Sequence, residues 1–218
     1  MALAIFDLDN TLLNGDSDYL WGQFLAQQGL VESAHYEKEN QRFYDEYVAG
    51  TLDIFEFLKF SLAPLTQMNM SELADLHNHF MDECIRPIIT TQSRSLIQKH
   101  IEQDDTLLII TATNLFITEP IADELGIANI LATDAEILNN RYTGKVYGTP
   151  CFQEGKVERL MSWLKKTNEN LVGSYFYSDS HNDLPLLEVV KHSIAVDPDD
   201  ILRSHAENKG WDIISLRN

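Results

Sequence analysis

Four short apolar runs, each followed or ended by a polar residue, constrain the fold of this 218-residue chain most strongly. They cover residues 2–6, 106–111, 174–178 and 193–196. Apolar runs of this length are typical of strands that are buried on both faces of a sheet. Segments with helical spacing lie between them, at residues 92–102, 115–125, 155–166 and 183–191. This alternation predicts an α/β fold built on a doubly wound parallel sheet.

The residues at the ends of these runs indicate where a ligand would bind. In an open parallel sheet the site lies just beyond the carboxyl ends of the strands. The first three runs lead into Asp7, Thr111 and Asp179. We therefore expect these three side chains to meet at one edge of the sheet.

Residues 16–86 have a different character, because they are rich in aromatic residues, Leu and Glu at helical spacing and contain no strand-like run. We predict that they form an inserted helical bundle, and that residues 1–15 and 87–218 form the core. We expect the apolar face of this bundle to be packed core rather than a ligand site. That face comprises Tyr19, Leu20, Phe24, Phe43, Tyr47, Phe55, Leu58, Leu62, Leu73, Leu76 and Phe80. Residues 134–146, with Asn139-Asn140 at their centre, are predicted to form a hairpin.

Composition and charge narrow the possible partners. Hydrophobic residues make up 44% of the chain and charged residues 23%, which is typical of a globular protein. The formal net charge of -18 argues against nucleic acid as a partner, because such binding depends on Lys and Arg. No apolar stretch approaches the roughly 18 residues of a membrane span, so we expect no membrane partner. Cys84 and Cys151 are expected to be free thiols, and a start that resembles no signal peptide favours a cytoplasmic location.

Asp7 and Asp9 place two carboxylates one residue apart directly after a buried strand. Crowded carboxylates are costly unless a cation lies between them, and a hard divalent ion such as Mg²⁺ fits such oxygen ligands. Taken alone, the pair could equally be turn-forming or helix-capping acids. A calcium loop is excluded, because Leu12 stands where that loop needs glycine.

Four motifs occur together in a set order. They are Asp7-Leu8-Asp9-Asn10-Thr11-Leu12, Thr111 at the end of a strand, Lys156 at the start of a helix, and Asp179-Ser180-His181-Asn182-Asp183 after a further strand. Together they resemble the haloacid dehalogenase superfamily of phosphohydrolases, over most of the chain. Within it the chain looks most like the phosphoserine-phosphatase-like branch (subfamily IB), whose helical cap follows the first motif. The resemblance implies a Rossmann-like core that carries this cap.

The resemblance also implies a reaction: Mg²⁺-dependent hydrolysis of a small phosphorylated metabolite. Asp7 would attack phosphorus to give an aspartyl-phosphate, and Asp9 would act as general acid and base. Thr111, Ala112 and Lys156 would bind the phosphate, and Mg²⁺ would bind Asp7, Asp179 and the main-chain carbonyl of Asp9. Supporting or substrate-contacting roles fall to Asp16, Asn114, Asn182 and Asp183.

The substrate stays open between two amine-bearing esters, phosphoserine and histidinol phosphate. Asp16 stands where the family has an acidic residue that contacts an ammonium group. The family's carboxylate-binding arginine is replaced by Ser61, with Lys59 or Arg42 as possible substitutes, and this weakens phosphoserine.

Three histidines and two alternative functions remain. His181 is expected at the surface or at the substrate mouth, and His77 and His79 are expected to be solvated.

A phosphotransferase and a non-catalytic protein that binds a phosphorylated metabolite are the alternatives on the same fold. A dehalogenase is disfavoured, since it has little use for Asp9 or a metal. The sequence does not predict the oligomeric state.

Overall fold

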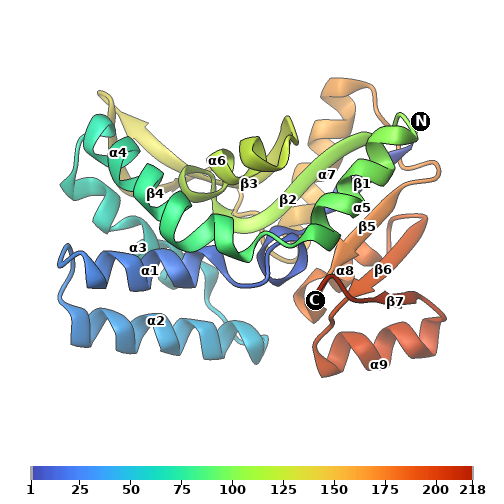
Figure 1. Cartoon of the computed structure of the whole chain (residues 1–218), viewed down its shortest axis with the longest axis horizontal. Coiled ribbons are helices and arrows are strands. Elements are labelled where there is room, and N and C mark those ends of the chain that lie inside the picture. The colour runs from blue at the N-terminus through green and yellow to red at the C-terminus, as the bar shows by residue number, and fades with distance from the viewer. Residues whose placement is uncertain (1, 218) are drawn as a thin grey trace.

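A seven-stranded sheet forms the centre of the computed structural model, which describes residues 2–217 (Figure 1). The ends of the predicted core, Met1 and Asn218, lie outside these residues. The strand order is β4-β3-β2-β1-β5-β6-β7. The strands are β1 (Leu3–Phe6), β2 (Thr106–Asn114), β3 (Asn129–Leu138), β4 (Arg141–Tyr147), β5 (Tyr175–Ser178), β6 (His192–Val196) and β7 (Asp212–Ile214).

All neighbouring strands run parallel except β3 and β4. The central strand β1 is buried along its whole length, and its Ile5 lies beside Leu108 of β2 and Phe176 of β5. The predicted α/β fold is confirmed. Two details differ: β2 continues to Asn114, which still pairs with Thr133 of β3, and the short edge strand β7 has no counterpart among the predicted strands.

Helices cover both faces of the sheet, because successive side chains of a strand point to opposite sides. Phe6 faces the cluster that includes Ile97 and Ile121, whereas Ile5 faces the cluster that includes Leu160 and Leu202. The first cluster involves α5 and α6, and the second involves α7, α8 and α9. Their bounds are α5 (Thr91–Glu102), α6 (Leu115–Leu125), α7 (Glu154–Thr167), α8 (Leu184–Leu187) and α9 (Asp200–Lys209).

The helix predicted over residues 183–191 is too long, since α8 ends at Leu187. After Leu187 the chain leaves the helix. The Ser193 hydroxyl donates to the Leu187 carbonyl, and the amide of His192 donates to the carbonyl of Ser174, just before β5. Pairing with the sheet therefore replaces the last helical turns.

The predicted hairpin is confirmed as the antiparallel pair of β3 and β4. Asn139 and Asn140 form its turn with φ of 52° and 60°, a left-handed conformation that asparagine tolerates better than most residues. The hairpin packs against the helix α3 (Ile54–Leu62). It therefore joins the sheet to the N-terminal helices.

Residues 16–86 contain four α-helices and no strand among the described positions. They are α1 (Ser17–Gln27), α2 (Ser33–Val48), α3 (Ile54–Leu62) and α4 (Met70–Phe80). In Figure 1, α1 and α2 lie side by side at one end of the molecule, away from β6, β7 and α9. The segment leaves and rejoins the rest of the chain at one place, because Leu13 and Ile89 form a β-bridge.

The expectation that the apolar face of these helices is packed core is wrong for four residues. Phe55 is 65% exposed, because it lies on the outer side of α3. Tyr19, Phe43 and Tyr47 line a cavity instead of only packing against other side chains. Phe24, Leu58, Leu62, Leu73 and Phe80 are buried as predicted, and Leu20 and Leu76 are partly buried.

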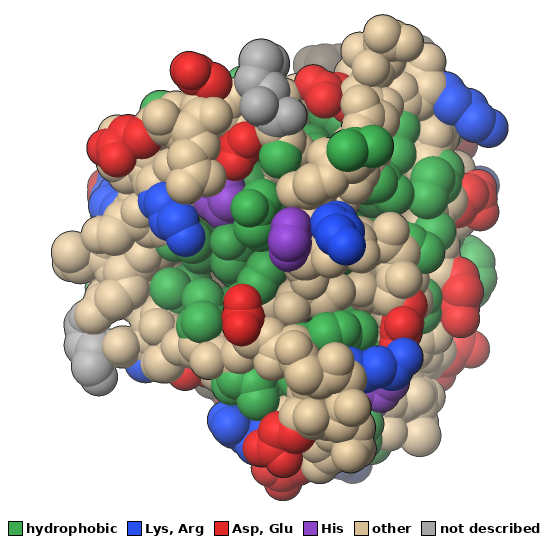
Figure 2. Space-filling view, turned by 90° about the vertical axis from the view of Figure 1, so that its right-hand side faces the viewer, with side chains coloured by type: hydrophobic (Ala, Val, Ile, Leu, Met, Phe, Trp, Pro, Cys, Tyr) green, Lys and Arg blue, Asp and Glu red, His purple; other side chains and the backbone are tan. Residues whose placement is uncertain are grey.

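Cys84 and Cys151 are free thiols, as expected. Within residues 2–217, no helix is long and apolar enough to cross a membrane. On the face drawn in Figure 2, Lys and Arg side chains are scattered among acidic and apolar ones and do not gather into one basic patch.

Candidate active site

A cavity lies between the carboxyl ends of β1 and β2 and the helices α1, α2 and α3. Its floor is polar and is formed by Asp7, Asp9, Thr111, Ala112 and Thr113. Three of these five residues belong to one strand, since β2 extends past Thr111 and presents consecutive residues to the cavity. The predicted meeting of the first two strand ends is therefore observed.

Lys156 is buried beneath this floor and joins two carboxylates. Its Nζ atom donates to Oδ1 of Asp7 and to Oδ2 of Asp183, each at 2.8 Å, and the side chain is only 2% exposed. Burial alone would lower the pKa of the Lys156 ammonium, but Asp183 and Asp7 raise it well above its usual value. The Ser178 hydroxyl also donates to Asp183, at 2.7 Å. Lys156 thus stays charged and holds Asp7 in place.

Asp7 and Asp179 both face the hydroxyl of Thr11. The Thr11 Oγ1 atom lies 3.3 Å from Oδ2 of Asp7 and 3.0 Å from Oδ1 of Asp179. Burial raises the pKa of Asp7 to about 7, with Lys156 opposing the shift. Burial, followed by repulsion from Asp7, raises the pKa of Asp179 well above its ordinary range. The positive charge near Asp7 and Asp179 is therefore too small to stabilise both carboxylates in their ionised form.

This arrangement fits a hard divalent cation. Mg²⁺ is commonly bound by one or two carboxylates, with water and substrate phosphate as its other ligands. Among residues 2–217, no group of three or more acidic, His or Cys side chains could hold an ion. Asp7 and Asp179, which share the Thr11 hydroxyl, are two carboxylates that could hold such an ion, and a cation would relieve their mutual repulsion.

Asp9 is held at the cavity floor by two donors. The main-chain amide of Ser17 donates to its Oδ1 at 2.6 Å, and the Thr113 hydroxyl donates to its Oδ2 at 2.8 Å. The backbone allows this because Asn10 adopts φ of 53°, which turns the chain sharply after Asp9. Burial, followed by repulsion from Asp16, raises the pKa of Asp9 to about 6. A carboxyl group with such a pKa can gain and lose a proton near neutral pH.

Two further carboxylates lie in the wall of the cavity, at the start of α1. Asp16 caps the helix by accepting from the amide of Tyr19 at 2.9 Å, and burial raises its pKa to about 6. Asp18 accepts from the hydroxyl of Ser61 at 2.9 Å, and burial raises its pKa to about 7. Aromatic side chains complete the wall, namely Tyr19, Phe43, Tyr44, Tyr47 and Phe57.

No basic side chain stands among the lining residues of this cavity in the part of the chain that the structure describes. Arg42 pairs with Glu39, Glu46 and Glu56 outside it. Lys59 is exposed on α3, and Ser61, at the place of the expected arginine, is bonded to Asp18. Neither Lys59 nor Arg42 therefore takes the place of a carboxylate-binding arginine.

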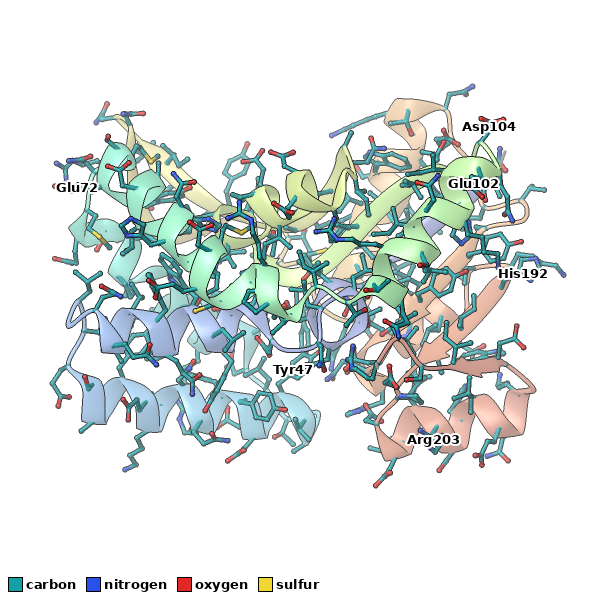
Figure 3. All side chains as sticks on the ribbon, in the orientation of Figure 1. Tyr47, Glu72, Glu102, Asp104, His192 and Arg203 are labelled. Carbon is teal, nitrogen blue, oxygen red and sulfur yellow. The ribbon has the colours of Figure 1, made fainter. Side chains whose placement is uncertain are left out.

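Asn114 and Asn182 lie outside the cavity lining. Asn114 is buried and caps α6 by accepting from the amide of Ile117 at 3.3 Å. The side-chain amide of Asn182 donates to the main-chain carbonyl of Tyr47 at 3.0 Å. Figure 3 labels Tyr47 at the end of α2, and this bond ties that helix to the loop after β5.

Two expectations about histidines are wrong. His77 is 4% exposed, because its Nε2 atom bonds the Ile117 carbonyl and its ring stacks on Trp21. His181 is half-buried and bonded to Asp199, so it is neither a free surface residue nor part of the cavity. His79 is exposed as expected.

The model of the family described as haloacid dehalogenase-like hydrolase matches residues 4–188. The chain belongs to the haloacid dehalogenase-like hydrolase family. The predictions that the chain belongs to the phosphoserine-phosphatase-like branch and that it is a phosphatase are confirmed.

The similar proteins include one curated relative that matches from end to end. A histidinol-phosphatase of Neisseria meningitidis serogroup C (strain 8013) is 48% identical over 219 residues, covering 99% of each protein. A crystal structure of a protein of unknown function from Bordetella pertussis Tohama I is 42% identical, with a TM-score of 0.93 and 99% coverage of both chains. A substrate-bound phosphoserine phosphatase has a TM-score of 0.72 at 18% identity, covering 99% of this chain and 93% of that one, and so shares the fold.

Several residues of this hydrolase site escaped prediction. The hydroxyl of Thr113 on Asp9 and that of Thr11 between Asp7 and Asp179 could have been suspected, since Thr11 lies within the first motif and Thr113 follows Thr111 by two residues. No pattern in the sequence indicated the bond between Asp18 and Ser61, because these residues lie 43 positions apart on different helices.

Proposed function

We propose that this chain is a Mg²⁺-dependent phosphatase whose substrate is histidinol phosphate or a close analogue. The observation that carries the proposal is the cavity itself. The buried pair of Asp7 and Lys156 lies at one end, and acidic and aromatic residues without a basic side chain line the other. The first end suits a phosphate ester, and the second suits a positively charged ring or amine.

Asp7 is the proposed nucleophile. Lys156 holds its Oδ1 atom at 2.8 Å, whereas Oδ2 has only a longer contact with the Thr11 hydroxyl, at 3.3 Å. Oδ2 is therefore the oxygen proposed to attack phosphorus. As the bond from Oδ2 to phosphorus forms, the ester bond from phosphorus to oxygen breaks, and an aspartyl-phosphate results. Lys156 neutralises charge near the transferred group, which is the main demand of phosphoryl transfer.

Asp9 is the proposed proton carrier. It gives its proton to the leaving alkoxide and then takes one from the water that attacks the aspartyl-phosphate, so that the enzyme returns to its starting state. The bonds from Ser17 and Thr113 orient its carboxyl group toward the cavity. Its raised pKa, about 6, suits both steps near neutral pH.

Thr111 and Ala112 are proposed to bind the phosphate oxygens together with Lys156. Asp7, Asp179 and the main-chain carbonyl of Asp9 would hold Mg²⁺. When bound, the ion would offset the negative charge of the phosphate and of the crowded carboxylates. Asp183 supports this set by fixing the Lys156 ammonium at 2.8 Å.

The choice of histidinol phosphate over phosphoserine rests on charge. A phosphoserine carboxylate would meet Asp16 and Asp18 with no arginine or lysine to receive it. Repulsion of this kind is an effective way to exclude a substrate. The end-to-end relative named histidinol-phosphatase, 48% identical, supports the same choice.

The domain division is part of this proposal. Residues 16–86 would act as a cap over a core of residues 1–15 and 87–218, because α1, α2 and α3 supply the cavity wall while the sheet supplies its floor. The two free thiols agree with a cytoplasmic setting. Nucleic acid is not a proposed partner, given the net charge of -18.

Release of phosphate from a panel of esters tests the proposal. The panel contains histidinol phosphate, phosphoserine, a sugar phosphate, a nucleotide and p-nitrophenyl phosphate, each with Mg²⁺ and with EDTA. We expect histidinol phosphate to be hydrolysed with the highest kcat/KM and EDTA to remove nearly all activity. Activity that survives EDTA would remove the metal from the mechanism. Binding of histidinol phosphate without hydrolysis would favour a binding protein, and transfer of the phosphate to an added alcohol would favour a phosphotransferase.

A further inference from the structure

Asp18 carries a buried oxygen atom that has no partner in the described structure. The residue is 8% exposed and lies in the cavity wall, in the first turn of α1. Its Oδ1 atom accepts from Ser61 at 2.9 Å, but its Oδ2 atom accepts no hydrogen bond. Buried polar atoms in native proteins are almost always bonded, so an exception of this kind calls for an explanation.

The catalytic steps proposed above do not use Asp18. Asp7, Asp9 and Asp179 are bonded to Lys156, Thr113 and Thr11 at the sheet end of the cavity. Asp18 is bonded only across to α3, on the helical side. Asp18 therefore belongs to the helical wall of the cavity and not to its floor at the sheet.

Among residues 2–217, the lining of the cavity offers no cation to this carboxylate. The lining of the cavity contains no Lys, Arg or His, and Arg42, on the neighbouring helix α2, is taken up by three glutamates. Asp16, the other acid in this wall, adds to the negative potential. A bound molecule must therefore bring the missing positive charge or N–H donor.

The surrounding rings narrow the kind of molecule. Phe43, Tyr44 and Phe57 line the same cavity. Aromatic faces attract organic cations and stack on flat rings. A cationic nitrogen heterocycle satisfies both the carboxylate and the rings, whereas an aliphatic carboxylate satisfies neither.

We propose that Asp18, held in place by Ser61, determines substrate specificity by binding a cationic N–H group of the substrate at the end opposite the phosphate. The substrate class is a phosphate monoester that carries a basic nitrogen ring, and esters with a carboxylate at that end are excluded. Ser61 acts as a positioning residue, because its hydroxyl fixes Oδ1 and leaves Oδ2 as the oxygen without a partner in the described structure. This inference rests on the proposed function and extends it to a residue outside the four motifs.

The test compares the wild-type enzyme with Asp18→Asn, which keeps the shape but removes the charge. Asp75→Asn makes the same chemical change at an exposed position of α4 and serves as the matched control. For each enzyme, kcat/KM is measured with histidinol phosphate and with p-nitrophenyl phosphate, which carries no cation. We expect Asp18→Asn to lower the ratio of the first to the second by about tenfold or more, the weight of one charge-assisted hydrogen bond. The Asp75→Asn ratio should match wild type, and an unchanged ratio in Asp18→Asn would overturn the inference.

Ser61→Ala is the second variant, in case Asp18→Asn folds poorly. It should shift the same ratio in the same direction by a smaller factor, mainly through KM, because it frees the carboxylate without removing it. An equal loss of kcat/KM with both esters would indicate general damage to the site and would count against the inference.

A binding measurement separates this inference from the proposed function. Calorimetry with histidinol, the dephosphorylated alcohol, requires no catalysis. Weaker binding to Asp18→Asn than to wild type supports the inference even if every ester fails to be hydrolysed, an outcome that would refute the phosphatase. Equal binding to both proteins overturns the inference while leaving the phosphatase intact.

Discussion

The Nζ atom of Lys156 lies 2.8 Å from Oδ1 of Asp7, although 149 residues separate them along the chain. Both side chains are buried, at 2% and 6% exposure, so the pair is shielded from solvent and from salt. Asp183, bonded to the same ammonium, extends the pair to a buried triad. This triad links the first strand, the start of α7 and the loop after β5 at one point.

The substitution Asp7→Asn tests whether Asp7 is the nucleophile. Asparagine keeps the shape of the side chain but cannot form the aspartyl-phosphate, so we expect kcat to fall by at least about 10³-fold, the scale of losing a catalytic nucleophile. Circular dichroism should stay that of the wild type, because Lys156 keeps Asp183 as its partner. Near wild-type turnover of a preparation shown by mass spectrometry to contain asparagine would refute the assignment of Asp7.

Lys156→Ala should damage stability as well as activity. It leaves the carboxylates of Asp7 and Asp183 buried without their cation, and breaking a buried pair in this way costs about 3–5 kcal/mol. Urea unfolding measures the loss. Lys166→Ala, at an exposed position near the end of the same helix, is the matched control and should change the free energy of unfolding by no more than about 0.5 kcal/mol. Similar values for the two variants would contradict the buried triad.

Gly155→Ala should displace the lysine beside it. A Cβ atom on Gly155 would lie 2.1 Å from the main-chain oxygen of Pro150, so the start of α7 has to move. We expect a loss of roughly 1–3 kcal/mol in stability, typical of overpacking, and a fall in kcat as Lys156 shifts from Asp7. A variant with unchanged kcat and unchanged urea midpoint would show that the contact is easily relieved.

The raised pKa of Asp18 predicts how stability depends on pH in the metal-free protein. Its pKa rises from 3.8 in the unfolded chain to about 7 in the folded one, mainly through burial. Between these values the folded state binds more protons, so the free energy of unfolding falls as pH rises from about 4 toward 7. Asp7, Asp9 and Asp16 act in the same direction.

Asp18→Asn should remove its share of this slope. In EDTA at pH 8 we expect the variant to be more stable than the wild type by on the order of 2 kcal/mol, since one pKa unit corresponds to about 1.4 kcal/mol. At pH 4 the two should differ little. Urea unfolding at both pH values checks this, with Asp75→Asn as control. A variant that is less stable than wild type at pH 8 would mean that Asp18 is not strained by its burial.

The local pattern of the chain was enough to predict the α/β fold and the meeting of Asp7 and Thr111 at one edge of the sheet. The role of Lys156 was indicated only by the resemblance of the four motifs to a known family. Strands buried on both faces must be apolar, and a ligand site must follow their carboxyl ends. Both features can therefore be recognised from short runs of consecutive residues. The hairpin at Asn139-Asn140 was predictable for the same reason, because its turn needs residues that tolerate positive φ.

The wall of the cavity was decided by tertiary structure alone. Tyr19, Phe43 and Tyr47 lie on helical faces whose spacing is the same whether they pack in a core or surround a ligand. His77 is buried because α4 packs against Trp21 and the start of α6, which no local pattern indicates. Asp18 meets Ser61 because α1 and α3 pack together, and only that packing leaves one of its oxygen atoms without a partner. Periodicity determines which residues share a face, whereas the packing of helices determines what each face meets.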